Sequence, residues 1–269
     1  MKIPNIILNR VLNFKKNRLI PKKFIRKIIK KNKIFFIETN LKSLPNANYS
    51  FEVSIDELTQ NIKNIKEDNS LPINECKNLA LILKLIYKDK ENFNFLDFGA
   101  QYLDNYYFIN RFNKNINYFY YDQPNVNKVV EEFTSKINLN NFVVLKDIDN
   151  LIKIKLDFIY CGSVIQYIDN YNEVINKLLS SKPKYVFFSG LNIFKKSEFK
   201  VIVCKQLNIF PKINYCYFFE EAYFENLIIS LGYNLMFTAK NPFSEVNYQN
   251  LEEKLKINCK YVDLIFERK

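Results

Sequence analysis

The sequence predicts an α/β fold with a seven-stranded, mostly parallel sheet, helices on both faces and an antiparallel addition at one edge. From residue 93 onward, short runs of β-branched and aromatic residues alternate with amphipathic stretches, a pattern typical of parallel sheets. Hydrophobic residues make up 48% of the 269-residue chain, enough for a large core. We expect three segments: a basic arm (1–35), an N-terminal helical segment (36–90) and the α/β domain (91–269).

Each element is predicted from its local pattern. Strands are expected at 93–98, 117–121, 141–145, 156–161, 184–189, 233–239 and 261–266. Helices are expected at 104–113, 125–136, 168–181 and 219–231, and before them at 75–87, where apolar residues recur at helical spacing. Ligands of such sheets bind at the carboxyl ends of the strands. This rule directs attention to residues 97–104, 121–124, 146–149 and 161–167.

The composition excludes several kinds of site. The chain has no histidine, which removes Ser-His-Asp and Cys-His nucleophile systems and all histidine metal sites. Its four glycines are too few for a P-loop and poorly suited to the pyrophosphate loop of an NAD-dependent oxidoreductase. The five cysteines form no Cys-x-x-Cys pair, so we expect free thiols and no metal site.

The net charge of +12 lies entirely in the arm. Residues 1–33 contain twelve Lys or Arg and no acidic residue, and the remaining 28 basic residues equal the 28 acidic ones. Within the arm, residues 21–31 predict a basic amphipathic helix with Phe24, Ile25, Ile28 and Ile29 on one side. Its apolar side either packs on the domain or lies on an anionic membrane surface.

A nucleic-acid partner is not expected, although it stays a third interpretation of the arm. Lys and Asn are abundant along the whole chain, so basicity alone is weak evidence for nucleic-acid binding. No run approaches 18 apolar residues. We therefore expect a cytoplasmic protein, with peripheral contact at the inner membrane face as the alternative.

Acidic residues follow three of the expected strands. Asp97-x-Gly99 ends the first strand, and Asp122 follows the second, 25 residues later. A carboxylate at the end of the second strand accepts hydrogen bonds from ribose hydroxyls in nucleotide-binding βαβ units. Asp147 follows the third strand, where it either approaches an adenine edge or occupies a solvated turn. This spacing indicates a nucleotide site.

Four blocks carry a family resemblance. They are residues 96–99 (Leu-Asp-Phe-Gly), 162–168 (Gly-Ser-Val-Ile-Gln-Tyr-Ile), 182–185 (Lys-Pro-Lys-Tyr) and 215–219 (Tyr-Cys-Tyr-Phe-Phe). In this order they resemble class I S-adenosylmethionine-dependent methyltransferases, and more narrowly a bacterial family associated with surface-polysaccharide gene regions. The resemblance covers about residues 50–240. It implies a Rossmann-like methyltransferase fold, S-adenosylmethionine as cofactor, and a small-molecule acceptor, namely a sugar or glycan precursor.

The resemblance also implies roles for single residues. The cofactor-binding set is Asp97, Gly99, Ala100, Gln101, Asp122, Asp147, Cys161, Gly162 and Ser163. The substrate-binding set is Gln166, Tyr167 and Tyr217. Other interpretations stay open for some of them: Ser163 as a turn cap, Gln166 and Tyr167 as ordinary helix residues, and the aromatic cluster around Tyr217 as core. No spacing selects a general base among Asp169, Glu220, Glu221 and Tyr167, and the two glutamates also suit the start of a helix.

The first loop departs from the family pattern. After Gly99 it continues with Ala100, Gln101, Tyr102 and Leu103, where the family has further glycines that let the backbone approach the cofactor closely. Two functions therefore stay open. The chain is either a working methyltransferase or a non-catalytic methyltransferase-like module that has lost cofactor binding and acts through a partner or the membrane surface.

Overall fold

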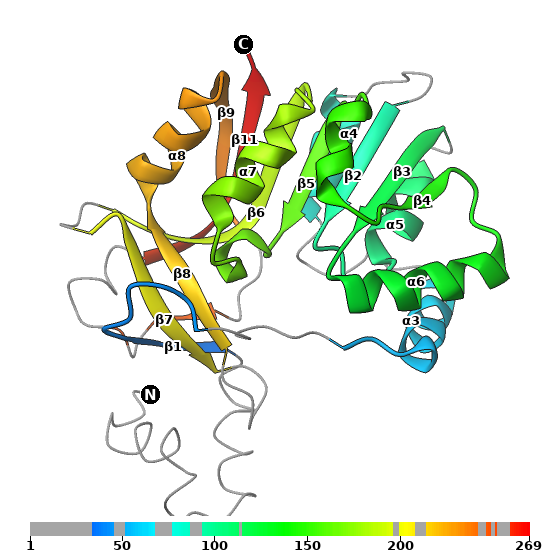
Figure 1. Ribbon diagram of the computed structural model, residues 1–269, viewed down its shortest axis with the longest axis horizontal. Coiled ribbons are helices and arrows are strands. Elements are labelled where there is room, and N and C mark those ends of the chain that lie inside the picture. The colour runs from blue at the N-terminus through cyan, green and yellow to red at the C-terminus, as the bar shows by residue number, and fades with distance from the viewer. Residues whose placement is uncertain are drawn as a thin grey trace, which may run out of the picture.

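The computed structural model describes residues 34–45, 52–67, 77–86, 93–112, 115–195, 199–207, 214–241, 246–248, 251 and 259–269 (Figure 1). The basic helix expected at 21–31 lies outside the described residues. The helices are α3 (Ile55–Glu67), α4 (Lys77–Ile86), α5 (Asp104–Phe112), α6 (Pro124–Ile137), α7 (Tyr171–Ser180) and α8 (Glu221–Ser230), with short 3₁₀ turns η2 (Ile148–Lys153) and η3 (Ile165–Tyr167).

All seven expected strands are present in one sheet. They are β2 (Phe93–Phe98), β3 (Ile116–Tyr121), β4 (Phe142–Val144), β5 (Phe158–Gly162), β6 (Tyr185–Phe194), β9 (Tyr233–Lys240) and β11 (Cys259–Arg268). Five of them pair in parallel in the order β4-β3-β2-β5-β6, and β11 and β9 continue the sheet antiparallel at the β6 edge. The predicted parallel sheet with its antiparallel addition is confirmed.

Helices cover both faces of this sheet, and each face has its own apolar cluster. One cluster contains side chains of α7 and α8, and the other contains side chains of α3, α4, α5 and α6. β2 serves both clusters because successive side chains of a strand point to opposite faces. Its Leu96 and Phe98 lie in the first cluster, and Phe93 and Phe95 lie in the second.

Four further strands extend the sheet beyond the expected seven. They are β1 (Ile34–Glu38), β7 (Val201–Leu207), β8 (Asn214–Glu220) and β10 (Val246–Asn247), in the order β10-β1-β7-β8-β6. In Figure 1, β8, β7 and β1 lie below β6, at the lower left. β6 continues past its predicted end at residue 189, and its last residues, Ile193 and Phe194, pair in parallel with β8. The helical interpretation of the segment from residue 36 is therefore wrong where that segment forms β1. These residues become a strand by pairing with β7, which lies far away in the sequence.

Asp263 joins β11 to the elements around it. It is fully buried, and its Oδ1 accepts hydrogen bonds from Ser189 Oγ (2.9 Å), Gly190 N (3.0 Å) and Asn241 Nδ2 (2.6 Å). Its Oδ2 accepts a bond from Asn78 Nδ2 on α4. A buried carboxylate is tolerated only with such partners, so Asp263 fixes β6, β11 and α4 to one another.

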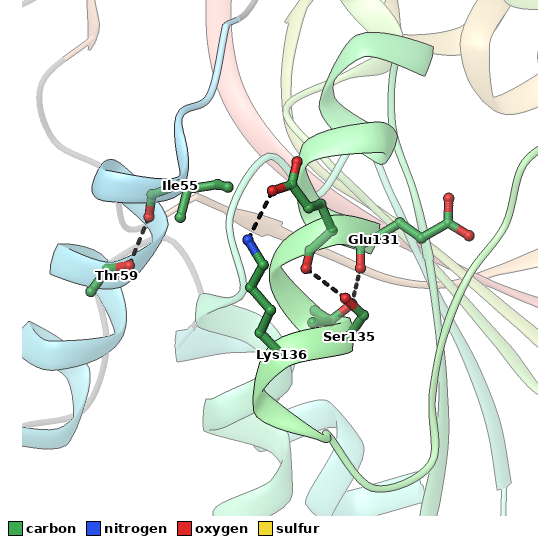
Figure 2. A network of polar contacts seen from close by, with 7 residues as sticks. Ile55, Thr59, Glu131, Ser135 and Lys136 are labelled. Atoms are coloured by element: carbon green, nitrogen blue, oxygen red, sulfur yellow. Dashed lines mark hydrogen bonds and ion pairs between the residues drawn. The ribbon is translucent and has the colours of Figure 1, made fainter.

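The contact between α3 and α6 is apolar. Figure 2 shows polar contacts along both helices, and each of them stays within one helix: Thr59 Oγ1 donates to Ile55 O (2.8 Å), and Lys136 Nζ lies 2.8 Å from an oxygen of Glu132. The apolar side chains of the two helices meet in the second cluster instead. Polar links of α3 run to α5: Asn61 Nδ2 donates to Asp104 Oδ1 (2.9 Å), and Arg111 Nη2 donates to Ile65 O (2.5 Å). Within the described part of the chain, no helix is long and apolar enough to cross a membrane.

Replacing Asp263 tests its role in the sheet. Asp263→Ala leaves buried donors on β6 and α4 without an acceptor, so the free energy of unfolding in urea should fall by about 3 kcal/mol or more. Asp149→Ala is the control because Asp149 forms an exposed ion pair with Lys177 (2.9 Å). Its loss should stay within about 0.5 kcal/mol. Similar losses in both variants would contradict this role of Asp263.

Candidate functional site

A pocket lies at the carboxyl ends of the parallel strands. Its volume is about 260 Å³, and its lining comes from the turns after β2, β3 and β5 and from η2, η3 and α7. The lining residues are Phe98, Gly99, Gln101, Tyr121, Asp122, Gln123, Pro124, Ile148, Gly162, Ser163, Val164, Tyr167, Ile168 and Val174. This is the position that the sheet topology predicts for a ligand.

The turn after β2 brings backbone close to the turn after β5. Gly99 has φ +74, and a Cβ there would collide with the side chain of Val164. Only glycine takes this conformation and this contact without strain. Two residues later, Gln101 has φ +55, which costs a residue with a Cβ about 1–2 kcal/mol. The loop thus keeps a left-handed conformation at a position where it has no glycine.

Asp122 joins the turns after β2 and β3. Its Oδ2 accepts a bond from Gln101 N (2.8 Å) and its Oδ1 from Gln123 N (2.6 Å), while Asn127 Oδ1 accepts a bond from Asp122 N (2.8 Å). Burial raises the pKa of Asp122, and the two N–H donors act against this rise. A carboxylate has about four acceptor positions. Asp122 therefore keeps acceptor capacity for a ligand in the pocket.

Asp97 lies behind the pocket rather than in its lining. Its Oδ2 accepts bonds from Tyr118 OH and from Asn105 Nδ2 (3.0 Å), whereas Oδ1 is buried with no partner among the described residues. Burial raises the pKa of Asp97 to about 7, the nearby charges of Asp122 and Asp104 add to the rise, and the two hydrogen bonds oppose it. Asp97 therefore gains or loses a proton near neutral pH.

The turn after β5 supplies the other side of the pocket. Gly162 lies so close to the ring of Tyr160 that a Cβ would meet it at 2.7 Å. Ser163 follows with φ +52 and is held there by the bond from its N–H to Ser189 O (2.8 Å). The serine, like Gln101, therefore accepts a strained conformation at the pocket.

Tyr167 and Gln166 occupy different places although they are neighbours in η3. Tyr167 lines the pocket, and its hydroxyl donates to Gln206 Oε1 on β7 (2.6 Å). Gln166 is fully buried, and its Nε2 donates to Gly190 O (2.9 Å). The helix expected from residue 168 begins at Tyr171 instead, because residues 165–167 form a separate 3₁₀ turn.

The structure thus brings six of the predicted site residues together in one pocket. These six are Gly99, Gln101, Asp122, Gly162, Ser163 and Tyr167. The other six are not part of its lining; they are Asp97, Ala100, Asp147, Cys161, Gln166 and Tyr217. Asp147 is exposed and its Oδ1 caps η2 by accepting a bond from Asp149 N (2.9 Å). Cys161 is buried, and burial raises the pKa of its thiol.

Of the candidate general bases, Tyr167 lines the pocket, whereas the three carboxylates do not. Asp169 Oδ1 accepts bonds from Tyr217 OH (2.6 Å) and Leu44 N (3.0 Å), which fastens the segment after β1 beside the pocket. Glu220 caps α8 by accepting a bond from Tyr223 N (2.6 Å), so its interpretation as a helix start is confirmed. Neither carboxylate lines the pocket.

The strand-end rule selected the ranges that contain Tyr121, Pro124 and Ile148 but gave these residues no role, and it did not reach Ile168 and Val174. Ile148 from η2, Val174 from α7 and Pro124 from α6 converge with Tyr121 on the pocket. Their only sequence signal is a place just after a strand or at the start of a helix. In the described part of the chain, no group of three or more Cys, Asp or Glu side chains could hold a metal ion.

The comparisons with known proteins fall into two parts. No family model and no curated protein match the sequence. Solved structures do match: the N-terminal domain of EvdMO1, with SAH bound, has a TM-score of 0.53 and 8% identity over 82% of this chain and 100% of that one.

Two other matches are more distant. A 1,6-didemethyltoxoflavin-N1-methyltransferase from Burkholderia thailandensis has a TM-score of 0.48 and 9% identity, over 87% of this chain and 99% of that one. An S-adenosylmethionine-dependent methyltransferase from Clostridium acetobutylicum has a TM-score of 0.44 and 10% identity, over 78% and 97%. The likeness to the EvdMO1 domain confirms the predicted Rossmann-like fold. At these identities the likeness extends to the fold alone.

The buried carboxyl of Asp97 predicts a pH dependence of stability. Because the folded pKa lies near 7 and the ordinary value is 3.8, the folded state binds the extra proton between these values. The contribution of Asp97 to the free energy of unfolding therefore falls as pH rises from about 4 to 7 and is constant above that range. The asparagine of Asp97→Asn resembles the neutral acid, so this variant should gain stability over the parent by up to about 4 kcal/mol at pH 8.

Urea denaturation at pH 5, 6, 7 and 8 measures this effect. Asp147→Asn serves as control, since Asp147 is exposed. A stability difference between Asp97→Asn and the parent that does not change with pH would contradict the account.

Proposed function

We propose that this protein is a methyltransferase that uses S-adenosylmethionine. The observation that carries the proposal is the carboxylate of Asp122, which lines a pocket formed by the turns after β2, β3 and β5 and keeps acceptor capacity toward it. A carboxylate at the end of the second parallel strand is suited to the two hydroxyls of a ribose. The methyltransferase fold and the SAH bound to the EvdMO1 domain support the same cofactor.

The pocket residues fit the chemical parts of this cofactor. Asp122 would accept the ribose hydroxyls, and the apolar wall around Tyr121 and Ile148 suits the faces of an adenine ring. Gly99 lets the first turn pack against Val164, which brings both turns to the pocket. Gln101 stands where the family has a further glycine, and it still adopts a left-handed conformation. The loop therefore has a backbone shape that glycine favours although it lacks the glycine. This supports the working enzyme over the non-catalytic module.

When bound, the cofactor supplies an electrophilic methyl group on a sulfonium. The protein then contributes mainly by holding the acceptor in line with that group and by keeping water away, since orientation supplies much of the acceleration of such displacements. The apolar lining from Ile148, Val164, Ile168 and Val174 suits the exclusion of water.

We also propose a sugar or glycan precursor as the acceptor. This proposal depends on the resemblance of residues 162–168, 182–185 and 215–219 to a family from surface-polysaccharide gene regions. The basic arm belongs to the same proposal, as a peripheral contact with the anionic inner face of a membrane. Liposome flotation with and without residues 1–33 tests this contact.

Calorimetric titration tests the cofactor. The protein should bind S-adenosylmethionine and S-adenosylhomocysteine in the micromolar range, and Asp122→Ala should weaken both by at least 100-fold because the ribose loses a charge-assisted acceptor. Asp147→Ala is the matched control: it removes an aspartate that follows the neighbouring strand but lies outside the pocket.

Thermal denaturation of each variant shows whether it is folded at the titration temperature. If the folded parent protein binds neither S-adenosylmethionine nor S-adenosylhomocysteine, the proposal is wrong and the non-catalytic module is favoured. Equal weakening by the two alanine variants would remove Asp122 as the ribose ligand.

A further inference from the structure

Two hydroxyl groups from non-neighbouring strands meet at the edge of the pocket, and one of them, that of Ser163, belongs to a lining residue. Ser163, in the turn after β5, lines the pocket, and its Oγ shares a hydrogen bond of 2.6 Å with the phenol of Tyr261 on β11. In the sheet, β6 lies between β5 and β11. The phenol therefore reaches across β6 to the pocket turn.

Gly190 on β6 makes room for this pair. A Cβ at position 190 would collide with both Ser163 Oγ and the Tyr261 hydroxyl, and the residue has φ +65. The glycine is thus the gap through which the tyrosine reaches the serine. It is itself fixed from two sides, because its N–H donates to Asp263 (3.0 Å) and its carbonyl accepts from Gln166 (2.9 Å).

The pair is held at the pocket at some cost. Ser163 keeps a left-handed conformation that residues with a Cβ rarely adopt, and strain of this kind is concentrated at functional sites. Both side chains are only half-buried, so the hydrogen bond is not an ordinary core contact. The strained backbone of Ser163 thus places its hydroxyl, which is hydrogen-bonded to the Tyr261 phenol, at the pocket.

The groups around the pair are amides and one buried carboxylate, that of Asp263, which accepts a hydrogen bond from Gly190 N. Gln166, fully buried beside Gly190, has an Oε1 with no partner among the described residues. Tyr167 also lines the pocket, and its hydroxyl donates a hydrogen bond to the side-chain amide oxygen of Gln206. Among the described residues that line the pocket, Asp122 alone carries a charge, and it follows β3 rather than β5. In the described lining on this side, the polar side chains are the hydroxyls of Ser163 and Tyr167, which both donate and accept, beside the apolar Val164 and Ile168.

We propose that Ser163, positioned by the phenol of Tyr261, binds the methyl acceptor through a neutral, hydroxyl-bearing group such as a sugar ring. This inference rests on the proposed function, since it requires the cofactor in the pocket beside the pair. It gives Ser163 to the acceptor rather than to the cofactor, and it adds Tyr261. A hydroxyl pair matches the donor and acceptor character of sugar hydroxyls. A carboxylate or phosphate would meet no Lys or Arg among the described lining residues to compensate its charge.

Saturation-transfer NMR on protein saturated with S-adenosylhomocysteine tests the proposal. The probes are methyl α-D-glucopyranoside, which is neutral, and glucuronate, which is anionic. Tyr261→Phe and Ser163→Ala each remove one hydroxyl and keep the remaining side-chain volume. Tyr233→Phe is the matched control because Tyr233 is a buried tyrosine on β9 whose hydroxyl donates to Pro183 O (3.0 Å).

The neutral probe should bind the parent protein and the Tyr233→Phe variant, with glucuronate bound at least tenfold more weakly. Tyr261→Phe and Ser163→Ala should each weaken the neutral probe at least tenfold and change calorimetric affinity for S-adenosylhomocysteine less than twofold. If Tyr261→Phe does not fold, Ser163→Ala alone is the test: at least tenfold weaker binding of the neutral probe supports the proposal, and unchanged binding overturns it.

The inference fails by itself if S-adenosylhomocysteine binds but the neutral probe does not. It also fails if glucuronate binds better or if both hydroxyl variants behave like Tyr233→Phe. Absence of S-adenosylhomocysteine binding to the parent protein overturns the proposed function as well, so the two failures are distinguishable.

Discussion

The structure depends on the close packing of two turns, one after β2 and one after β5. Gly99 lies against Val164 with no room for a Cβ, and the next turn along the sheet is tied in by the carboxylate of Asp122, which accepts from Gln101 N (2.8 Å). These contacts fix three strand ends around one pocket. The elements η2, η3 and α7 then add side chains to the pocket that these three turns form.

The regular core was predictable because its signals are local. All seven expected strands and the helices between them follow from apolar periodicity, and β2 was expected with the bounds that it has. The four added strands were not expected, since Ile34–Glu38 becomes a strand only by pairing with β7, more than 160 residues away. A pattern along the chain carries no information about such a partner.

The site was predictable in position but not in its division of roles. Strand ends identified Gly99, Asp122 and Gly162, which line the pocket, but the same rule also selected Asp97 and Asp147. Alternation along β2 turns Asp97 away from the pocket toward Tyr118 and Asn105, and a local backbone bond turns Asp147 into a cap. Tyr261 had no signal at all, because its contact with Ser163 depends on a glycine in the strand between them.

The central claim is that the carboxylate of Asp122 holds a nucleoside in this pocket. A crystal structure of the protein with S-adenosylhomocysteine tests it most directly. The account predicts both ribose hydroxyls within hydrogen-bond distance of Asp122 and the adenine between Tyr121 and Ile148. A nucleoside bound elsewhere, or bound here with Asp122 making no contact to the ribose, would contradict it.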